Sequence, residues 1–326
     1  MSKALNVAIC QINPTLGSFE NNLNKITNNY EQAIKKGADL VVFPEMSITG
    51  YPPQDLLSNN KFVDHNINCL EKLSKMVTVP CIFGFVDSVD ENKYNAAAVC
   101  QNGKIVYKYH KIHLPNYDVF DERRYFKSGD SVGVFDLKIN NSNYKIALQI
   151  CEDLWEDEYE RKISDEIIEN DPDLIINISA SPFAKDRKKD RIKLIQSKYK
   201  NANCPFIYCN LVGGQDELIF DGFSMAFNSE LELINMANGF QEQILLTDLN
   251  TKVSIENSSS CEQLFKALSL GIKDYFIKTG HEKAVIGLSG GIDSALVACL
   301  AVDALGSNNV YLVSMPSRFS SDHSKS

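Results

Sequence analysis

The pattern of apolar runs in the first 250 residues constrains the fold of this 326-residue chain more than any other feature. Short strand-like runs alternate with segments whose apolar residues recur at helical spacing. Asn102 and Gly103 join two runs as a tight hairpin, whereas other runs are separated by helix-length crossovers. The mixture predicts an α/β fold in which helices cover one face of a mixed sheet. Strands are expected at residues 5–12, 40–43, 81–86, 96–100, 104–110, 144–150, 174–178, 206–211 and 223–227, with helices at 19–34, 62–77 and around 192–199.

A change in composition near residue 250 indicates a domain boundary. Residues 250–261 are polar and rich in hydroxyl groups, which is typical of a linker. An amphipathic helix closed by Gly280 follows, and after it come a strand, a second helix and a further strand. We therefore predict a first domain at 1–249, a linker at 250–261 and a second, incomplete domain at 262–326.

Charge and cysteine usage exclude several classes of protein. A net charge of −9 argues against nucleic acid or an anionic membrane as the main partner. No apolar stretch reaches membrane-spanning length, and the N-terminus lacks a signal-peptide core, so a cytoplasmic protein is expected. Nine cysteines without a C-x-x-C pair and five histidines without zinc spacing predict reduced thiols and no zinc or organic cofactor.

A glycine-rich run lies between the strand and the helix of the predicted second domain. Such a turn points backbone N–H groups at an anion, and the helix N-terminus adds a partial positive charge. The order of hydroxyl, glycine, aspartate and hydroxyl favours phosphate binding over the alternative, an ordinary glycine-containing turn. The residues of this phosphate-binding candidate are Gly287, Leu288, Ser289, Gly290, Gly291, Ile292, Asp293 and Ser294.

Three reactive side chains each follow a predicted strand of the first domain: Glu45, Lys111 and Cys151. Ligand sites of open α/β sheets gather where strands end, so the three can share one cleft. An ammonium group stabilises a thiolate, and a carboxylate can take the thiol proton and return it to a leaving amine. This set suits acyl transfer through a thioester with release of ammonia. Taken singly, the three also fit a buried strand-end thiol, a capping carboxylate and a surface lysine.

The sequence motifs around these residues resemble the three signatures of the nitrilase, or carbon–nitrogen hydrolase, superfamily, in family order. The motifs are FPEM at 43–46, YHKIHLP at 109–115 and ICEDLW at 150–155. Further stretches resemble the glutamine-dependent NAD⁺ synthetases in particular. These are TGYPPQD at 49–55, HLPNY at 113–117, FDERRYF at 120–126, SASPF at 179–183, GGQDEL at 213–218, the run 287–294 and MPSR at 315–318. The resemblance extends over nearly the whole chain.

The resemblance implies a nitrilase-type α-β-β-α sandwich, followed by the start of a Rossmann-like adenine-nucleotide α-hydrolase domain. It implies that Glu45, Lys111 and Cys151 hydrolyse L-glutamine and that run 287–294 binds ATP with Mg²⁺. Ammonia would then convert adenylated nicotinic acid adenine dinucleotide to NAD⁺, with release of AMP and diphosphate. A homo-oligomer is also implied. The implied glutamine-binding residues are Tyr117, Glu122, Glu152, Trp155, Ser181 and Arg187, the last at a position where many relatives have lysine.

The length of the chain departs from this family, whose synthetase domain extends well beyond residue 326. We therefore expect a fragment in which only the glutaminase half is complete, with little or no NAD⁺ synthesis of its own. Two alternatives stay open. One is a stand-alone amidase with a vestigial C-terminal segment, against which the phosphate-type loop counts. The other is a non-catalytic subunit, against which the intact set of acid, amine and thiol counts.

Overall fold

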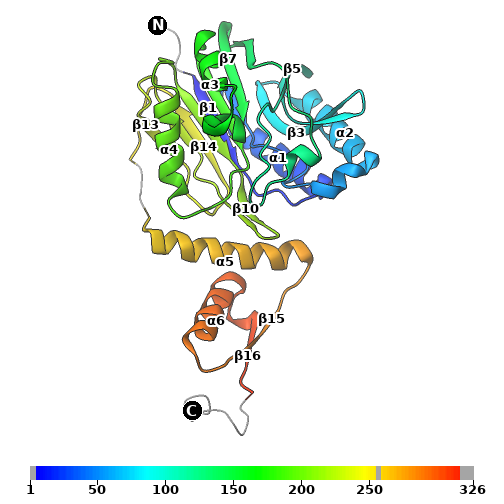
Figure 1. Ribbon diagram of the computed structural model, residues 1–326, viewed down its shortest axis with the longest axis vertical. Helices are drawn as coiled ribbons and strands as arrows, with labels where there is room; N and C mark the ends of the chain where they lie inside the picture. Colours follow the sequence, from blue (N-terminus) through cyan, green and yellow to red (C-terminus); the bar gives the residue numbers. More distant parts are fainter. Residues whose placement is uncertain (1–4, 255–257, 316–326) are drawn as a thin grey trace. The chain divides into compact units, whose positions relative to one another are not determined.

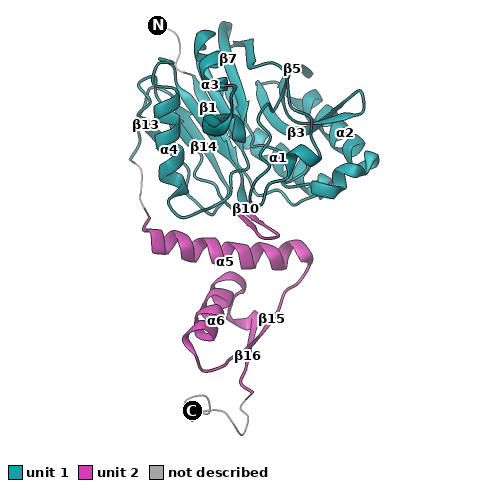
Figure 2. Cartoon of the chain, viewed as in Figure 1, with its two compact units in different colours: residues 1–212, 220–256 teal, residues 213–219, 257–326 magenta. Residues whose placement is uncertain are grey.

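A computed structural model describes residues 5–254 and 258–315 of the chain. The chain divides into two compact units, one formed by residues 1–212 and 220–256 and the other by residues 213–219 and 257–326 (Figure 2). The hairpin tip 213–219, which the sequence placed in the first domain, belongs to the second unit, within which the Gly214 N–H donates to Asp274 at 2.7 Å. Part of the predicted linker, 255–257, and Pro316 to Arg318 of the MPSR stretch lie outside the described residues.

The first six-stranded sheet has the order β14-β1-β2-β3-β4-β5 (Figure 1). Strands β1, β2 and β3 are parallel, and the remaining neighbours pair antiparallel. The hairpin between β4 and β5 turns at Asn102 and Gly103, both at positive φ, as the Asn-Gly pair predicts. The strands are β1 (Asn6–Gln11), β2 (Leu40–Val42), β3 (Cys81–Val89), β4 (Asn92–Gln101), β5 (Lys104–His110) and β14 (Gln243–Asp248).

A second six-stranded sheet has the order β13-β12-β9-β8-β7-β6, with β7, β8 and β9 parallel. The apolar runs predicted a mixed sheet and the resemblance an α-β-β-α sandwich, and the first unit has the two sheets of such a sandwich. The apolar runs did not reveal edge strands β6, β13 and β14. These edge strands are short or only partly buried, so their apolar pattern is weak. The strands are β6 (Gly133–Ile139), β7 (Ser142–Ile150), β8 (Leu174–Ser179), β9 (Phe206–Asn210), β12 (Met225–Phe227) and β13 (Leu233–Met236).

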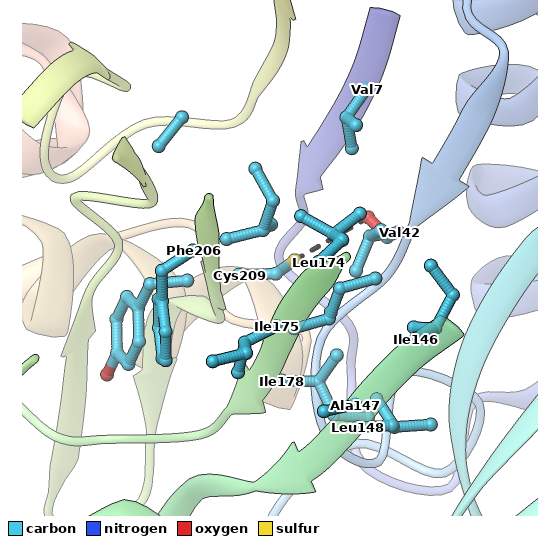
Figure 3. Packing of buried hydrophobic residues seen from close by; sticks show 14 of the residues in the cluster. Val7, Val42, Ile146, Ala147, Leu148, Leu174, Ile175, Ile178, Phe206 and Cys209 are labelled. Carbon is cyan, nitrogen blue, oxygen red and sulfur yellow. Dashed lines mark hydrogen bonds between the residues drawn. The ribbon is translucent and has the colours of Figure 1, made fainter. Parts of the chain in front are cut away.

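The main hydrophobic core lies between the two sheets. Alternate residues of β1 and β2, such as Val7 and Val42, pack with Leu148 and Ile178 of the second sheet (Figure 3). The Cys209 thiol also reaches across, donating to the Val42 carbonyl at 3.5 Å. Because strand side chains alternate, the other face of each sheet must be covered by helices.

Helices α1 (Phe19–Lys35) and α2 (Asn60–Met76) cover the outer face of the first sheet, and their buried side chains form a second core with Cys10, Val41 and Phe83. Helices α3 (Ile163–Glu169) and α4 (Arg187–Lys198) contribute Ile163, Ile167 and Ile195 to the packing of the second sheet. The first unit is thus the expected α-β-β-α sandwich. A further hairpin consists of β10 (Val212–Gln215) and β11 (Leu218–Asp221), and its tip, residues 213–219, belongs to the second unit.

The second unit contains a strand–helix–strand arrangement. Helix α5 (Ser260–Thr279) begins where the Ser259 hydroxyl caps the Glu262 N–H, and it ends at Gly280 with φ +76°. Strand β15 (Ala284–Gly287) pairs parallel with β16 (Val310–Val313), and α6 (Ile292–Leu305) connects the two. Within the described parts of the chain, no helix is long and apolar enough to cross a membrane.

Candidate active site

The three side chains predicted at strand ends share one buried polar cluster. Glu45 follows β2, Lys111 follows β5 and Cys151 follows β7. The Lys111 Nζ lies 2.8 Å from Glu45 Oε1 and 3.0 Å from Glu122 Oε1. Both bonds are withdrawn from water, since Glu45 and Lys111 are each only 1% exposed. A buried ammonium between two carboxylates is held in a single position.

The electrostatics of the cluster keep Lys111 charged. Burial alone would lower the pKa of Lys111, but the carboxylates of Glu122 and Glu45 outweigh it and raise that pKa well above its usual value. The pKa of Glu122 is raised by burial and by Glu45, although Lys111 acts in the opposite direction. The cluster therefore holds a permanently charged Lys111 ammonium next to the carboxyl groups of Glu45 and Glu122, which have different surroundings.

Cys151 lies at the first position of a short 3₁₀ helix, η3 (Cys151–Leu154), with φ +43°. A non-glycine residue at positive φ is uncommon, and such strain concentrates at functional sites. Burial and the Glu45 carboxylate raise the pKa of the Cys151 thiol well above its usual value, and Lys111 lowers it less. The sequence led us to expect a net lowering by Lys111. The structure instead gives a protonated resting thiol that needs a base when it attacks.

Glu45 is positioned by contacts that the sequence did not suggest. A Cβ on Gly84 of β3 would lie 2.3 Å from the Pro44 carbonyl and 2.6 Å from the Glu45 Cα. Only a residue without a side chain allows the Glu45 segment to approach β3 this closely. The Ala180 N–H donates to Glu45 Oε2 at 2.6 Å, and the Asn95 amide donates to Oε1 at 2.6 Å. Glu45 is therefore fixed from both sheets.

Asp153 connects the lysine segment to the cysteine segment. Its Oδ1 accepts the N–H groups of Ile112 and His113 at 3.1 and 2.8 Å. Its Oδ2 accepts the Ile150 N–H at 2.9 Å and the Tyr109 hydroxyl at 2.8 Å. Burial raises the pKa of Asp153 to about 6, and these donors limit the rise.

Two of the predicted glutamine-binding residues, Tyr117 and Glu152, contact each other directly. The Tyr117 hydroxyl donates to both oxygens of Glu152, at 3.1 and 3.0 Å, and Tyr159 donates to Oε1 at 3.1 Å. Burial raises the pKa of Glu152 to about 7 even though the two tyrosines and Lys111 oppose the shift. Glu152 immediately follows Cys151, and its carboxylate is close enough to the thiol to raise the Cys151 pKa further.

The other predicted glutamine-binding residues form separate contacts. The Arg187 guanidinium lies over the Trp155 ring, 4.9 Å from its centroid. The Ser181 hydroxyl accepts from the fully buried Arg191 at 3.1 Å, and Arg191 in turn pairs with Asp221 at 2.8 Å. Glu122 belongs to the lysine cluster described above.

The sequence reasoning missed Tyr51, Asn95, Asp153 and Arg191. Tyr51 donates to Glu122 at 2.9 Å, although it lies far from Glu122 in sequence. Tyr51 and Asp153 lie inside the sequence motifs on which the resemblance rests, so those motifs could have identified them as site residues. Asn95 lies just before the predicted apolar strand 96–100, within β4 of the structure, and Arg191 lies in a basic helix. Neither pattern distinguishes a site residue from a surface residue.

The glycine-rich run forms an exposed loop between β15 and α6. The Ser294 hydroxyl accepts from the Ser289 N–H at 3.2 Å and donates to the Gly291 carbonyl at 3.0 Å, and the Ser289 hydroxyl lies 3.0 Å from that of Ser294. Gly290 has φ +82°, and the loop ends at Gly291, the N-cap of α6. Among the residues that the structure describes, no group of three or more His, Cys, Asp or Glu side chains could hold a metal ion.

The first unit thus combines an α-β-β-α sandwich with a buried cluster of thiol, ammonium and carboxylates, and comparisons with known proteins show its family. The carbon–nitrogen hydrolase family model matches residues 6–256, so the chain belongs to the carbon–nitrogen hydrolase family. The NAD synthase model matches residues 264–326. Both parts of the fold class expected from the sequence are thereby confirmed.

Among its relatives are the glutamine-dependent NAD(+) synthetases of Thermotoga maritima, 40% identical over 99% of this chain, and of Synechocystis, 41% identical over 98%. The chain spans only 62% and 61% of these two proteins. The structure of the Acinetobacter baumannii glutamine-dependent NAD⁺ synthetase in complex with ADP aligns with a TM-score of 0.92 and 33% identity, covering 99% of this chain and 61% of that one. The resemblance to glutamine-dependent NAD⁺ synthetases, inferred from the sequence motifs, is confirmed. A Nesterenkonia amidase of the nitrilase superfamily, 18% identical with a TM-score of 0.66, shares the fold of the first unit.

Proposed function

We propose that the first unit hydrolyses the side-chain amide of L-glutamine at Glu45, Lys111 and Cys151. The observation that carries this proposal is the buried Lys111 ammonium, held between Glu45 and Glu122 beside a strained, protonated Cys151. Membership of the carbon–nitrogen hydrolase family supports it.

In this reaction Glu45 takes the thiol proton as the Cys151 sulfur attacks the amide carbonyl. The Lys111 ammonium and the backbone N–H that follows the cysteine stabilise the negative oxygen of the tetrahedral intermediate. Glu45 then gives its proton to the amide nitrogen, the C–N bond of the tetrahedral intermediate breaks, and ammonia departs, leaving the Cys151 thioester. Water attacks the thioester, Glu45 accepts its proton, and glutamate leaves as the thiol is restored.

The substrate amino acid has an ammonium and a carboxylate, and the pocket offers groups for both. Glu152, with Tyr117 and Tyr159 donating to it, would receive the α-ammonium group. Arg187, stacked on Trp155, would pair with the α-carboxylate, and Ser181 would donate a hydrogen bond to the substrate. Glu122 would keep the Lys111 ammonium directed at the oxygen of the reacting carbonyl.

We further propose that the ammonia serves the synthesis of NAD⁺ from ATP and nicotinic acid adenine dinucleotide. The NAD synthase match, the ADP complex of the Acinetobacter baumannii relative and the hydroxyl-lined loop at 289–294 support this. The loop would hold the ATP phosphates on its N–H and hydroxyl groups. Mg²⁺ would accompany the phosphates, since Asp293 and the serine hydroxyls are oxygen ligands of the kind it prefers. A homo-oligomer is part of the same proposal.

Exchange of Cys151 for alanine tests the glutaminase assignment. We expect Cys151→Ala to abolish ammonia release from glutamine, since the thioester cannot form, whereas Cys261→Ala, at an exposed cysteine, retains full activity. Ammonia is measured in a coupled assay, and ATP binding is titrated in the same preparation by calorimetry.

Ammonia release by folded Cys151→Ala at the wild-type rate would contradict the assignment. Faster hydrolysis of simple aliphatic amides than of glutamine, together with no ATP binding, would favour a stand-alone amidase.

A further inference from the structure

Asn95 of β4 contacts more of the reacting cluster than its place in an apolar strand suggests. Its Nδ2 donates to Glu45 Oε1 at 2.6 Å and lies 3.4 Å from Glu122 Oε2. Its backbone carbonyl accepts the Lys111 N–H at 2.8 Å. The residue is 1% exposed, so water does not compete for these bonds. One side chain thus faces both carboxylates, and its backbone holds the lysine.

The orientation of the Asn95 amide follows from the charges around it. Both carboxylates lie on its Nδ2 side, and the opposite orientation would point a carbonyl oxygen at two acids. The Oδ1 atom is buried without a hydrogen-bond partner in the described structure. An unpaired buried acceptor is costly and uncommon, and it marks a position where another requirement dominates. Here that requirement is donation to Glu45 and Glu122.

A neutral donor suits this position better than a charged one. The groups that face Glu45 are Lys111, Glu122, Cys151, Tyr51 and the Ala180 N–H. A second ammonium would weaken Glu45 as a base, and a third carboxylate would repel both acids. An amide stabilises the ionised carboxylates through hydrogen bonds without adding net charge.

We infer that Asn95 is a positioning residue that holds the Glu45 carboxylate in place beside the Cys151 thiol and keeps it apart from Glu122. This inference rests on the proposed amide hydrolysis. Asn95 acts through Glu45, so its removal changes the pH range in which the base functions as well as the rate.

The test uses Asn95→Asp, which is isosteric and replaces the amide donors with an acid, and Asn95→Leu, which removes the donors alone. We expect the acid limb of the kcat/KM profile for glutamine to move up by about 1 pH unit in Asn95→Leu and further in Asn95→Asp. The plateau should fall at least about tenfold. Glu152 is unaltered in both variants, so its own titration cancels in the comparison.

Asn66→Leu is the matched control. Asn66 is an equally buried asparagine of α2 whose amide bonds only the backbone of Val86. Its variant should retain the wild-type pH profile, and thermal unfolding identifies any variant that fails to fold. An acid limb that stays in place in folded Asn95→Leu would overturn the inference, and so would an Asn95→Asp that is as active as wild type.

A second measurement separates this inference from the proposed function. Alkylation of Cys151 by iodoacetamide needs the same base but no glutamine, and it is followed by mass spectrometry of the Cys151 peptide between pH 5 and 9. A wild-type protein without glutaminase activity would refute the proposed function alone. The alkylation profile of Asn95→Leu would still support the role of Asn95 by shifting to higher pH, or refute it by matching wild type.

Discussion

At the scale of single residues, the site depends on groups whose ionisation is set by burial. Lys111 is kept charged by two acids, Cys151 is kept protonated, and Glu152 changes its ionisation near neutral pH. The roles assigned to them follow from these states: an electrostatic stabiliser, a nucleophile that needs a base, and an anion that can receive an ammonium group. Residue type alone would not distinguish the three carboxylates Glu45, Glu122 and Glu152.

The raised pKa of Glu152, about 7, makes the stability of the first unit depend on pH. The folded form keeps the proton up to about pH 7, whereas the unfolded chain releases it near its ordinary pKa of 4.5. The contribution of Glu152 to the free energy of unfolding is therefore fully present below pH 4.5 and is lost as the pH rises to about 7. The loss is at most about 3–4 kcal/mol, from roughly 2.5 pH units at 1.4 kcal/mol each.

We expect Glu152→Gln to remove this loss, because glutamine does not ionise. Urea unfolding of wild type and variant at pH 4.5 and pH 7.5 measures it, and Glu158→Gln, on the exposed part of the same segment, is the control. The difference between Glu152→Gln and wild type should shift in favour of the variant as the pH rises. An equal pH dependence in both proteins would contradict the pKa assigned to Glu152.

At the scale of elements, strand ends from both sheets converge on one point. Strands β2 and β5 of the first sheet deliver Glu45 and Lys111, and β7 of the second delivers Cys151. Asp153 joins the segments after β5 and β7, and Ala180, which follows β8, donates to Glu45. The site is therefore sensitive to the spacing of backbone segments as well as to its own side chains.

Gly84→Ala is expected to lower kcat for glutamine by about 100-fold or more, because the new Cβ displaces the Glu45 segment from β3. The overpacking should also destabilise the protein by about 1–3 kcal/mol. Initial rates and thermal unfolding measure the two effects.

Gly37→Ala is the matched control. Gly37 has a positive φ, +91°, so a side chain there is strained, but its Cβ meets nothing within 4 Å. It should lose about 1–2 kcal/mol of stability with no loss of kcat. Equal losses of kcat in the two variants would mean that Gly84 acts through general stability.

At the scale of the whole molecule, the two units differ in how much apolar surface they bury. Residues such as Ile146, Ile175 and Phe206 of the first unit are fully buried between packed layers. In the second unit Val285 is 73% exposed and Ile292 is 81% exposed, and among the described residues β15 and β16 form a two-stranded sheet. A two-stranded sheet with little burial gains little stability from packing.

Hydrogen exchange should reveal this difference. We expect backbone amides of β15, α6 and β16 to exchange at least about 100-fold faster than those of β7 and β8, since local opening exposes few buried contacts. Peptide-level mass spectrometry of the 326-residue protein measures both sets at once. ATP at saturating concentration should slow exchange in the loop at 289–294 if it binds there. Equal protection of the two units would refute the assignment of lower stability to the second.

Prediction from sequence succeeded where the pattern is local. The period-two and helical spacings located most buried strands and the main helices, and Asn102-Gly103 located a hairpin. Strand β14 was missed because it is only partly buried, so its apolar pattern is weak. The reactive groups Glu45, Lys111 and Cys151 could be named because each follows a recognisable strand. Asn95 and Arg191 could not, because their partners come from distant segments.

The sequence by itself determined the class of fold and the chemical types in the site, because both depend on local patterns and on residue identity. Only the tertiary structure decided how those groups are charged and which residues support them. Ionisation depends on burial and on neighbours from other strands, and these exist only once the two sheets have packed. The raised pKa of Cys151, contrary to the expected lowering, is the clearest instance, because burial and Glu45 together outweigh the nearby Lys111.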